Sequence, residues 1–403
     1  MIKNQENFCI LPWIHLYAEP DGKVYPCCTA SPFDGVTPVV GNLKENTLSE
    51  VYHSDQWNKL RKQMMNGERA EACTRCWQFD DAGGSSYRQH NNRVFEKFRH
   101  IVDETHDDGS IDDFRFKFIN VRDSIECNFA CLTCGPMWST GWNKYNRIGK
   151  QITKGKTHLN DNSKVPIWDQ VKEHLHTADS IYFTGGEPLM MPEHYKTLDY
   201  MIQNGLTDTR LIYNTNMSNL NLQKYNVLDK WKMFDRVEVG ASIDAVGKRA
   251  EIIRWGTKWD EVEANLLSLK GYDNIHLGVD SVISLLNIDH VPTMQRHLEK
   301  VGIVDGSTIM SYNIAFGPDI SITSLPDEIK QRMELYLLDH FNKYEGPLKH
   351  HMKWGYKQVI NFMKEKNTWN RDQFKHLINS RYYFAKDDLL EHLPLVKEMY
   401  EHE

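Results

Sequence analysis

Apolar residues recur with two different periods along the chain, and the change of period divides it. From about residue 114, short β-type runs alternate with stretches of helical spacing. The strand-like runs are 114–121, 180–185, 210–215, 236–243, 275–284 and 309–316, and the helix-like stretches are 192–204, 220–232, 258–270 and 289–301. Such alternation predicts an α/β fold with a parallel sheet and crossover helices. Six strands are too few for an eight-unit barrel, so we expect a partial (β/α)6 TIM-like barrel.

The first hundred residues follow a different pattern and predict a small separate module. Two strand-like runs flank a turn signal at Pro20-Asp21-Gly22. Thr47 and Glu50 form a capping box before a stretch of helical spacing, which ends at Asn66-Gly67. The acidic stretch 103–113 is typical of a solvated surface loop or linker.

Beyond residue 320 the apolar spacing is helical throughout. We expect this helical C-terminal extension to cover the open barrel or to contact a partner. The predicted domains are therefore 1–100, 101–320 and 321–403.

Composition and charge favour a globular protein and disfavour nucleic-acid-binding and membrane proteins. The chain has 403 residues, of which 40% are hydrophobic and 26% charged, as in ordinary globular domains. Its formal net charge of -7 disfavours duplex nucleic acid as a partner. The N-terminus has no apolar signal region, and no stretch approaches a membrane span. We therefore expect a cytoplasmic protein that does not enter membranes, in which eight cysteines indicate metal or redox chemistry before disulfides.

Three of these cysteines, Cys127, Cys131 and Cys134, stand close together just after the first barrel strand. Ligands of parallel sheets gather at the carboxyl ends of strands, so this position suits a functional site. Three thiolates can hold three irons of a cube and leave the fourth iron open. A structural zinc site usually has two knuckles, and a ferredoxin run adds a fourth cysteine next to proline. Inert buried cysteines would not explain the clustering.

The spacing Cys-x-x-x-Cys-x-x-Cys after the first strand of a partial barrel resembles the radical S-adenosylmethionine (SAM) superfamily. The resemblance implies a [4Fe–4S] cluster on Cys127, Cys131 and Cys134, with SAM on the open iron. Reductive cleavage of SAM then gives a 5′-deoxyadenosyl radical, which abstracts hydrogen from a substrate. The chain departs from many members at Thr133, where an aromatic residue is common.

Polar residues at the ends of later strands match further motifs of that superfamily. Phe183–Pro188, FTGGEP, resembles the loop that binds the amino group of SAM. Arg254 could pair with the SAM carboxylate, and a surface ion pair is its alternative. Asn216 belongs to a loop that resembles a Thr-Asn-Gly motif, although Met217 replaces the glycine. The resemblance therefore implies cofactor contacts at Gly185, Gly186, Glu187, Asn216, Ser242, Asp244 and Arg254.

The N-terminal module carries a second set of cysteines. Cys9, Cys27, Cys73 and Cys76 supply four thiolates, the number that closes a cluster or a zinc site. The strings DGKVYPCC, GNLKENTLSEVY and CTRCW resemble the SPASM/twitch domain, here in its shorter twitch form and ahead of the barrel. The resemblance implies an auxiliary [4Fe–4S] cluster, the second of two. Cys28 is left over, and either Cys27 or Cys28 could be the ligand.

These resemblances imply an enzyme that modifies a peptide, a protein or a small molecule, with an electron donor such as flavodoxin or ferredoxin. Nucleotide modification by the same chemistry is an alternative reading. Another is a non-catalytic iron–sulfur or zinc protein, which the missing fourth thiolate at the triad disfavours. The sequence singles out no catalytic acid, base or hydrogen donor.

Overall fold

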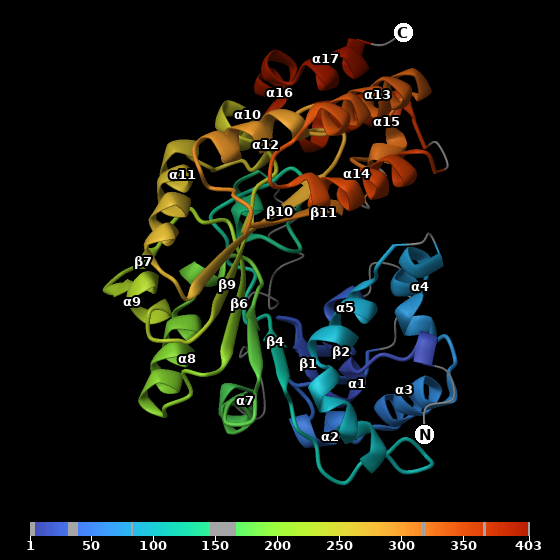
Figure 1. Cartoon of the computed structure of the whole chain (residues 1–403), viewed down its shortest axis with the longest axis vertical. Helices are drawn as coiled ribbons and strands as arrows, with labels where there is room; N and C mark the ends of the chain where they lie inside the picture. Colours follow the sequence, from blue (N-terminus) through green and yellow to red (C-terminus); the bar gives the residue numbers. More distant parts are fainter. Residues whose placement is uncertain are drawn as a thin grey trace. The chain divides into compact units, whose positions relative to one another are not determined.

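The computed structural model describes residues 5–30, 39–81, 84–145, 167–315, 317, 319–365 and 368–401. The described residues form two compact units, each made of several sequence segments. Figure 1 colours the chain along its sequence. The first unit takes those within 1–125, 154–185 and 196–212, and the second takes those within 126–153, 186–195 and 213–403. Boundaries between the units fall inside helix α8, Pro192–Gln203, and inside strand β6, Arg210–Thr215.

The strands of the first unit combine a hairpin with parallel pairs. Strand β1 pairs antiparallel with β2, which pairs with β3, and β1 also pairs parallel with β4. Strand β4 pairs parallel with β5, in a register that sets Phe118 opposite Ser180. The bounds are β1 His15–Ala18, β2 Lys23–Tyr25, β3 Gly41–Asn42, β4 Phe118–Val121 and β5 Ser180–Phe183. The hairpin predicted around Pro20-Asp21-Gly22 is confirmed.

Helices cover the strands of the first unit. The capping box of Thr47 and Glu50 is present, but the helix that it begins stops at Tyr52. The prediction of one helix up to Asn66 is therefore wrong, because the Ser54 hydroxyl accepts from the Trp57 amide and begins a second helix. The helical segments are η1 Gln5–Asn7, α1 Leu11–Ile14, η2 Cys28–Ala30, α2 Leu48–Tyr52, α3 Asp55–Asn66, η3 Glu71–Cys73, α4 Thr74–Asp81, α5 Tyr87–Val94, η4 Glu96–Glu104, α7 Ile167–Leu175 and, from residue 196 on, α8 Pro192–Gln203.

The second unit contains three parallel strands in register. Strand β10 lies between β9 and β11, and Asp280 pairs with Ser242 on one side and Ser311 on the other. Residues on one face of these strands are buried, while those on the other face are half-buried or exposed. The bounds are β7 Asn221–Leu222, β8 Tyr225–Asn226, β9 Val237–Ser242, β10 Ile275–Ile283 and β11 Ile309–Ile314.

The six predicted strands from 114 onward are all present, and together they confirm a mostly parallel α/β sheet that is not closed. The first is shorter than predicted and begins at Phe118. The helix predicted over 220–232 is wrong in its first half, where β7 and β8 form a hairpin. Gln223 there has a positive φ of 52°, which a helix does not allow. Asn226 then caps the short helix α9.

The C-terminal extension is helical, as predicted. Helix α14 packs on β11, where Gly355 makes room for the ring of Tyr312, so covering of the strands is confirmed for this helix. Figure 1 shows α14 next to β11 and α13 beside α14. The helical segments of this unit are η5 Thr140–Lys144, η6 Pro188–Met190, α9 Val227–Trp231, α10 Gly247–Ile253, α11 Trp259–Ser268, η7 Leu269–Gly271, α12 Val291–Lys300, η8 Ile322–Ser324, α13 Asp327–Lys343, α14 Lys349–Met363, α15 Arg371–His376, the π-helical η9 Leu377–Arg381, α16 Lys386–His392 and α17 Pro394–Glu401.

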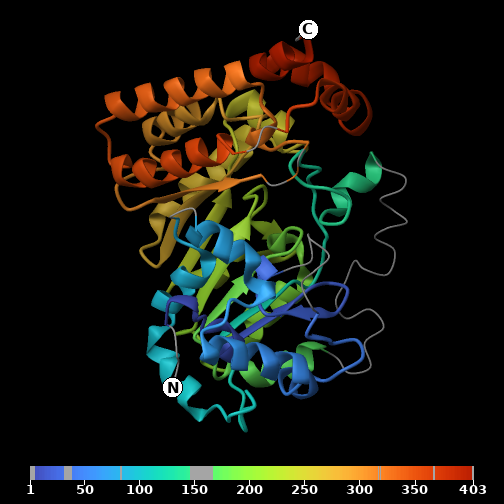
Figure 2. The same ribbon diagram turned by 90° about the vertical axis from the view of Figure 1, so that its right-hand side faces the viewer.

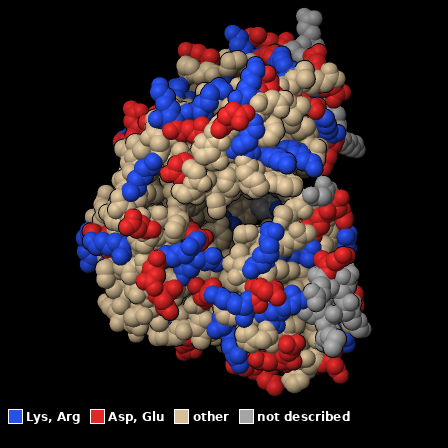
Figure 3. Space-filling view, in the orientation of Figure 1, with Lys and Arg blue, Asp and Glu red and all other residues tan. Residues whose placement is uncertain are grey.

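The surface carries charges of both signs. On the face drawn in Figure 3, Lys and Arg side chains are interspersed with Asp and Glu side chains and do not gather in one region. Among the described residues, no helix is both long and apolar enough to cross a membrane.

Candidate functional site

The three cysteines of the triad lie on one loop that follows β4, and each is partly exposed. Two backbone hydrogen bonds tie this loop to the end of α10. The amide of Ala130 donates to the carbonyl of Trp255, and that of Leu132 donates to the carbonyl of Ile253, both at 2.8 Å. The backbone of the cysteine loop is therefore fixed on both sides of Cys131.

A second segment, Ser139–Trp142, supports the loop from its own chain. The Thr140 hydroxyl accepts from the Cys127 amide at 3.1 Å, and the Trp142 indole donates to the Cys131 carbonyl at 3.2 Å. Gly141 approaches so closely that a Cβ there would lie 2.3 Å from the Phe129 carbonyl oxygen. Sequence reasoning missed this segment, although its glycine and tryptophan stand within ten residues of Cys134.

The thiols of Cys127 and Cys131 are protonated at neutral pH when no metal is bound. Burial raises the pKa of Cys127 and of Cys131 to about 12. Metal binding must therefore release protons. Among the described residues, no three His, Cys, Asp or Glu side chains converge on a point where one metal ion would sit. In a [4Fe–4S] cluster each cysteine thiolate binds a different iron, so the thiolates need not converge on one point. Three spaced thiols on one loop therefore fit a cluster better than a single metal ion.

Arg254 lies between the two residues that anchor the loop. Its Nη1 atom is 4.0 Å from the sulfur of Cys131. Its Nε atom forms an ion pair with Asp244 Oδ2 at 2.9 Å, although the two are not aligned as a hydrogen bond. The other Asp244 oxygen accepts from the Val282 amide at 2.8 Å. The structure therefore brings Arg254 to the triad, and Asp244 holds its guanidinium there.

Glu187 is directed toward the end of β6. Its Oε1 accepts from the Thr215 hydroxyl at 2.7 Å and from the Leu189 amide at 3.1 Å, and its Oε2 accepts from the Asn216 amide at 2.7 Å. Each carboxylate oxygen has two lone pairs, so only Oε2 keeps one acceptor position. Burial raises the pKa of Glu187. Gly185, two residues earlier, has a φ of 127°, which favours glycine at that position.

Asn216 contacts the cysteine loop directly. Its Nδ2 atom donates to Asn128 Oδ1 at 2.9 Å and lies 4.0 Å from the sulfur of Cys127. The next residue, Met217, is fully buried and has a positive φ of 55°. The backbone shape that glycine would adopt easily is therefore kept here by a methionine.

Three of the predicted cofactor residues, Asn216, Ser242 and Arg254, line one small pocket. Its volume is about 10 Å³, which is room for one water. A ligand as large as SAM would have to extend beyond it. Neighbouring lining residues such as Ala245 and Ala250 give the pocket an apolar side.

Sequence reasoning missed Asp280, the one carboxylate in the middle of β10. Asn214 donates to its Oδ2 at 3.2 Å, and Ser311 is a second hydrogen-bond partner. Burial raises the pKa of this half-buried group. A Cβ at Gly240 would lie 2.3 Å from Asp280 Oδ2, so the glycine makes room for the carboxylate. Strand register joins Asp280 to Ser242, and only the paired strands could have shown this.

The auxiliary cysteines gather in the first unit. Cys9, Cys27 and Cys76 are buried, and Cys73 is partly exposed. Burial, followed by the nearby thiols of Cys9, Cys27 and Cys76, raises the pKa of Cys73. The structure therefore brings these four predicted ligands within electrostatic reach of one another.

Cys28 is oriented differently from its neighbour Cys27. The Cys27 sulfur lies 3.1 Å from the Thr29 hydroxyl. The Cys28 thiol hydrogen-bonds with Tyr87 and lies near Arg122, and burial raises its pKa to about 11. Cys28 is therefore satisfied by groups outside the set of four.

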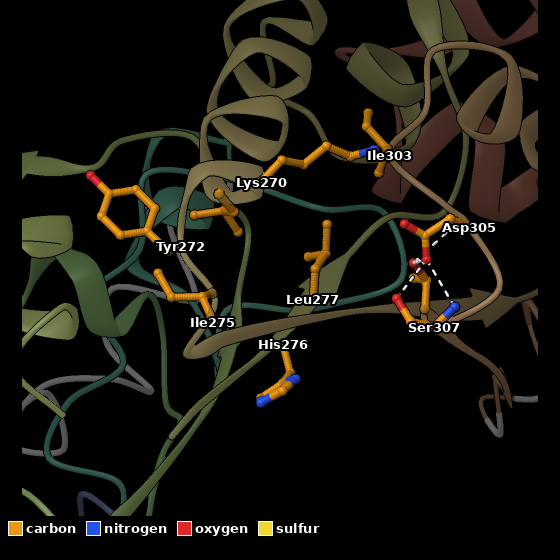
Figure 4. A pocket seen from close by; sticks show the side chains of 10 residues that line it. Lys270, Tyr272, Ile275, His276, Leu277, Ile303, Asp305 and Ser307 are labelled. Carbon is orange, nitrogen blue, oxygen red and sulfur yellow. Dashed lines mark hydrogen bonds between the residues drawn. The ribbon is translucent and has the colours of Figure 1, made fainter. Parts of the chain in front are cut away.

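Another hollow, of about 270 Å³, lies at the amino ends of β10 and β11 (Figure 4). Lys270, His276 and Asp305 line it, and Asp305 accepts from the amide and hydroxyl of Ser307. Sites in parallel sheets lie at the carboxyl ends, so this hollow is at the end opposite the expected one.

Comparison with known proteins identifies the domain that holds the second cysteine set. Residues 9–77 match the family model of SPASM, an iron–sulfur cluster-binding domain. The match begins at Cys9 and ends one residue after Cys76, so it includes all five N-terminal cysteines. The predicted auxiliary iron–sulfur domain is thereby confirmed. No curated protein matches the sequence.

Several solved structures are remotely similar. Native anSMEcpe with bound AdoMet is 16% identical with a TM-score of 0.39, and 57% of this chain covers 62% of that one. The complex of anSMEcpe with AdoMet and the Cp18Cys peptide is 15% identical with a TM-score of 0.36, and 56% of this chain covers 58% of that one. Streptococcus suis SuiB bound to its precursor peptide SuiA is 12% identical with a TM-score of 0.36, and the coverage is 76% and 68%. This chain therefore spans about three fifths of the anSMEcpe chains.

Proposed function

We propose that this chain is a radical SAM enzyme with an auxiliary cluster in its SPASM domain. The observation that carries the proposal is the cysteine loop. It presents three thiols after β4, is fixed by backbone bonds on both sides of Cys131, and has Asn216 and Arg254 against two of its sulfurs. Three thiolates leave one iron of a cube open for a cofactor.

The residues around the loop divide the work of holding SAM. Arg254 presents a guanidinium to a carboxylate group, and Asp244 fixes its orientation. The free acceptor position of Glu187 Oε2, next to the Gly185-Gly186 turn, suits an ammonium group. Ser242 and Asn216 line the pocket beside them and suit hydroxyl groups. Together these groups complement an amino acid joined to a nucleoside.

With both bound, the cluster and SAM would supply reductive cleavage of a carbon–sulfur bond and a 5′-deoxyadenosyl radical that abstracts hydrogen. The chain itself provides orientation and a dry setting. Phe129, Leu132 and Trp142 are almost fully buried around the loop, so they limit the access of water to its inner side.

In the SPASM domain, Cys9, Cys27, Cys73 and Cys76 would hold the auxiliary [4Fe–4S] cluster. Four thiols would satisfy all four irons, so such a cluster would have no open position and would accept an electron or only stabilise the site. The hydrogen bond between Cys28 and Tyr87 supports Cys27 as the ligand of the pair. An electron donor such as flavodoxin or ferredoxin would reduce the cluster of the triad.

The polar face of the second unit supports a substrate with peptide-like groups. Asn214, Ser242 and Ser311 surround the Asp280 carboxylate on the half-buried face of the strands. Amide and hydroxyl groups pair with neutral donors and acceptors, and a carboxylate pairs with an amine or amide N–H. A peptide, a protein segment or an amino-acid-like small molecule offers both.

Anaerobic reconstitution followed by reduction tests the proposal. We expect about eight irons per chain, and 5′-deoxyadenosine on addition of dithionite and SAM. A Cys131→Ala variant should lose that product, and a Cys28→Ala variant should keep it. Two results would overturn the proposal. One is about one zinc per chain with little iron, and the other is an electron paramagnetic resonance (EPR) spectrum of the iron centre that does not change when SAM is added.

A further inference from the structure

A short segment of the C-terminal extension contacts the cysteine loop from more than 240 residues away in the sequence. The Tyr382 hydroxyl donates to the Leu132 carbonyl at 2.6 Å. The neighbouring Arg381 donates through Nη2 to the Cys134 carbonyl at 2.8 Å. Figure 2 shows the red C-terminal helices beside the teal segment that carries the loop. We call Leu377–Phe384 the C-terminal brace.

The backbone of the brace explains how two successive side chains reach the same loop. Leu377–Arg381 forms a π-helical turn, which is wider than an α-helical turn and is frequently found at functional sites. Leu377, Ile378 and Tyr382 are buried, so the turn is anchored in the core while Arg381 stays at the surface.

Aromatic packing fixes the end of the brace against the chain that follows the triad. The ring of Phe384 stacks on Tyr145 with centroids 4.1 Å apart. The same ring makes T-shaped contacts with Trp142 and Trp255, with ring centroids 5.5 Å and 5.3 Å apart. Trp142 in turn donates to the Cys131 carbonyl. The brace therefore contacts the cysteine loop both directly and through a residue that supports it.

Arg381 differs from the other arginine beside the triad in its charge environment. Arg254 is paired with Asp244, so its charge is largely compensated. In the part of the chain that the structure describes, Arg381 forms no ion pair, and its guanidinium lies 5.7 Å from the ring centre of Trp142. Among the described residues, Arg381 is therefore a cation that contacts the backbone of a triad cysteine without a carboxylate partner.

We propose that the C-terminal brace positions the cysteine loop and that Arg381 raises the reduction potential of the cluster it holds. The proposal rests on the function proposed above. Reduction adds one negative charge to a cluster, and a nearby cation stabilises the reduced form more than the oxidised form. Hydrogen bonds to the backbone that carries a ligand also hold that ligand in place. Arg381 and Tyr382 are thus positioning residues.

Redox titration followed by EPR tests the electrostatic part. Arg381→Gln removes the charge and should shift the midpoint potential of the SAM-binding cluster to a more negative value, while Arg381→Lys should restore most of it. Arg332→Gln is the matched control, since it removes a cation of the same extension that pairs with Glu398. An unchanged potential in Arg381→Gln, or an equal shift in Arg332→Gln, would overturn this part.

Hydrogen exchange in the metal-free protein tests the positioning part without any cluster. The amides of Leu132 and Cys134 are both hydrogen-bonded, to Ile253 and Cys131. In Tyr382→Phe, which keeps the buried ring and loses one hydrogen bond, these amides should exchange several-fold faster. Unchanged exchange would refute the brace. If the wild type binds no cluster, the proposed function fails, and the exchange result still decides the brace.

Discussion

The guanidinium of Arg254 lies 4.0 Å from the sulfur of Cys131, and its neighbours Ile253 and Trp255 hold the cysteine loop by backbone hydrogen bonds. One short segment therefore sets both the path of the loop and the charge beside it. A cation fixed next to a metal thiolate can also meet the carboxylate of a bound cofactor. Because the two backbone hydrogen bonds flank Arg254, they fix its position relative to the cysteine loop.

Replacing Arg254 should weaken SAM binding more than it weakens the fold. In Arg254→Lys the planar fork is lost and the charge is kept, so we expect the dissociation constant of SAM to rise by about tenfold, or ~1.4 kcal/mol. Calorimetry or equilibrium dialysis on the reconstituted protein measures this. Arg249→Lys is the control, because Arg249 lies in helix α10, which ends just before Arg254, and pairs with Asp289. Equal losses in both variants would contradict a role in binding.

Iron analysis separates Cys27 from Cys28. Cys27→Ala should lower the iron content by about four per chain, since one cube then lacks a thiolate, and Cys28→Ala should leave it near the wild-type value. Both changes remove one thiol from adjacent positions of the chain, so they serve as controls for each other. The reverse result would assign the ligand to Cys28.

Gly240 and Asp280 should be coupled in stability. A Cβ at Gly240 meets the Asp280 carboxylate, so Gly240→Ala should lower the free energy of unfolding by about 1–3 kcal/mol. In an Asp280→Ser background the same change should cost much less. Urea unfolding of the four proteins completes the cycle, and simple additivity would show that the two side chains do not meet.

Acid should destabilise the metal-free protein through buried histidines, of which His15 is a clear case. Burial lowers the pKa of His15 to about 4 from 6.5, so the unfolded state binds the proton first as the pH falls. Stability should therefore be lost between pH 6.5 and pH 4, by about 2–3 kcal/mol for this residue. His15→Phe should flatten that part of the curve of unfolding free energy against pH. His276→Asn, at an exposed position, should not.

Much of the fold could be predicted from local sequence patterns. The alternation of apolar runs predicted the six strands. The rule that ligands bind at the carboxyl ends of parallel strands predicted where the triad and the pocket residues lie. The brace could not be found this way, because Arg381 and Tyr382 reach the loop only through a π-helical turn and distant packing. Asp280 was hidden for a similar reason, since its partners Asn214 and Ser311 lie on other strands.

The direction of the Glu187 side chain was also beyond the sequence. A motif names the residue, but it does not say which of its oxygens are occupied by Thr215, Leu189 and the Asn216 amide. How many hydrogen bonds the Glu187 carboxylate accepts depends on the path of the chain at the end of β6, and only the folded backbone fixes that path.

Met217 gives a prediction that reverses the usual order of two substitutions. Its φ of 55° costs a non-glycine residue roughly 1–2 kcal/mol, and its side chain is fully buried. Both Met217→Gly and Met217→Ala lose most of that buried area, so both should be less stable than the wild type.

The alanine variant keeps the backbone cost and the glycine variant does not, so Met217→Gly should be the more stable of the two by about 1 kcal/mol. Met201 is the matched control, because it is equally buried but lies in helix α8. There, alanine should be more stable than glycine by about 1 kcal/mol. Urea unfolding of the four variants measures both differences. The same order at both positions would mean that the Met217 backbone carries no strain, and that the loop beside Cys127 does not need the shape which glycine usually supplies.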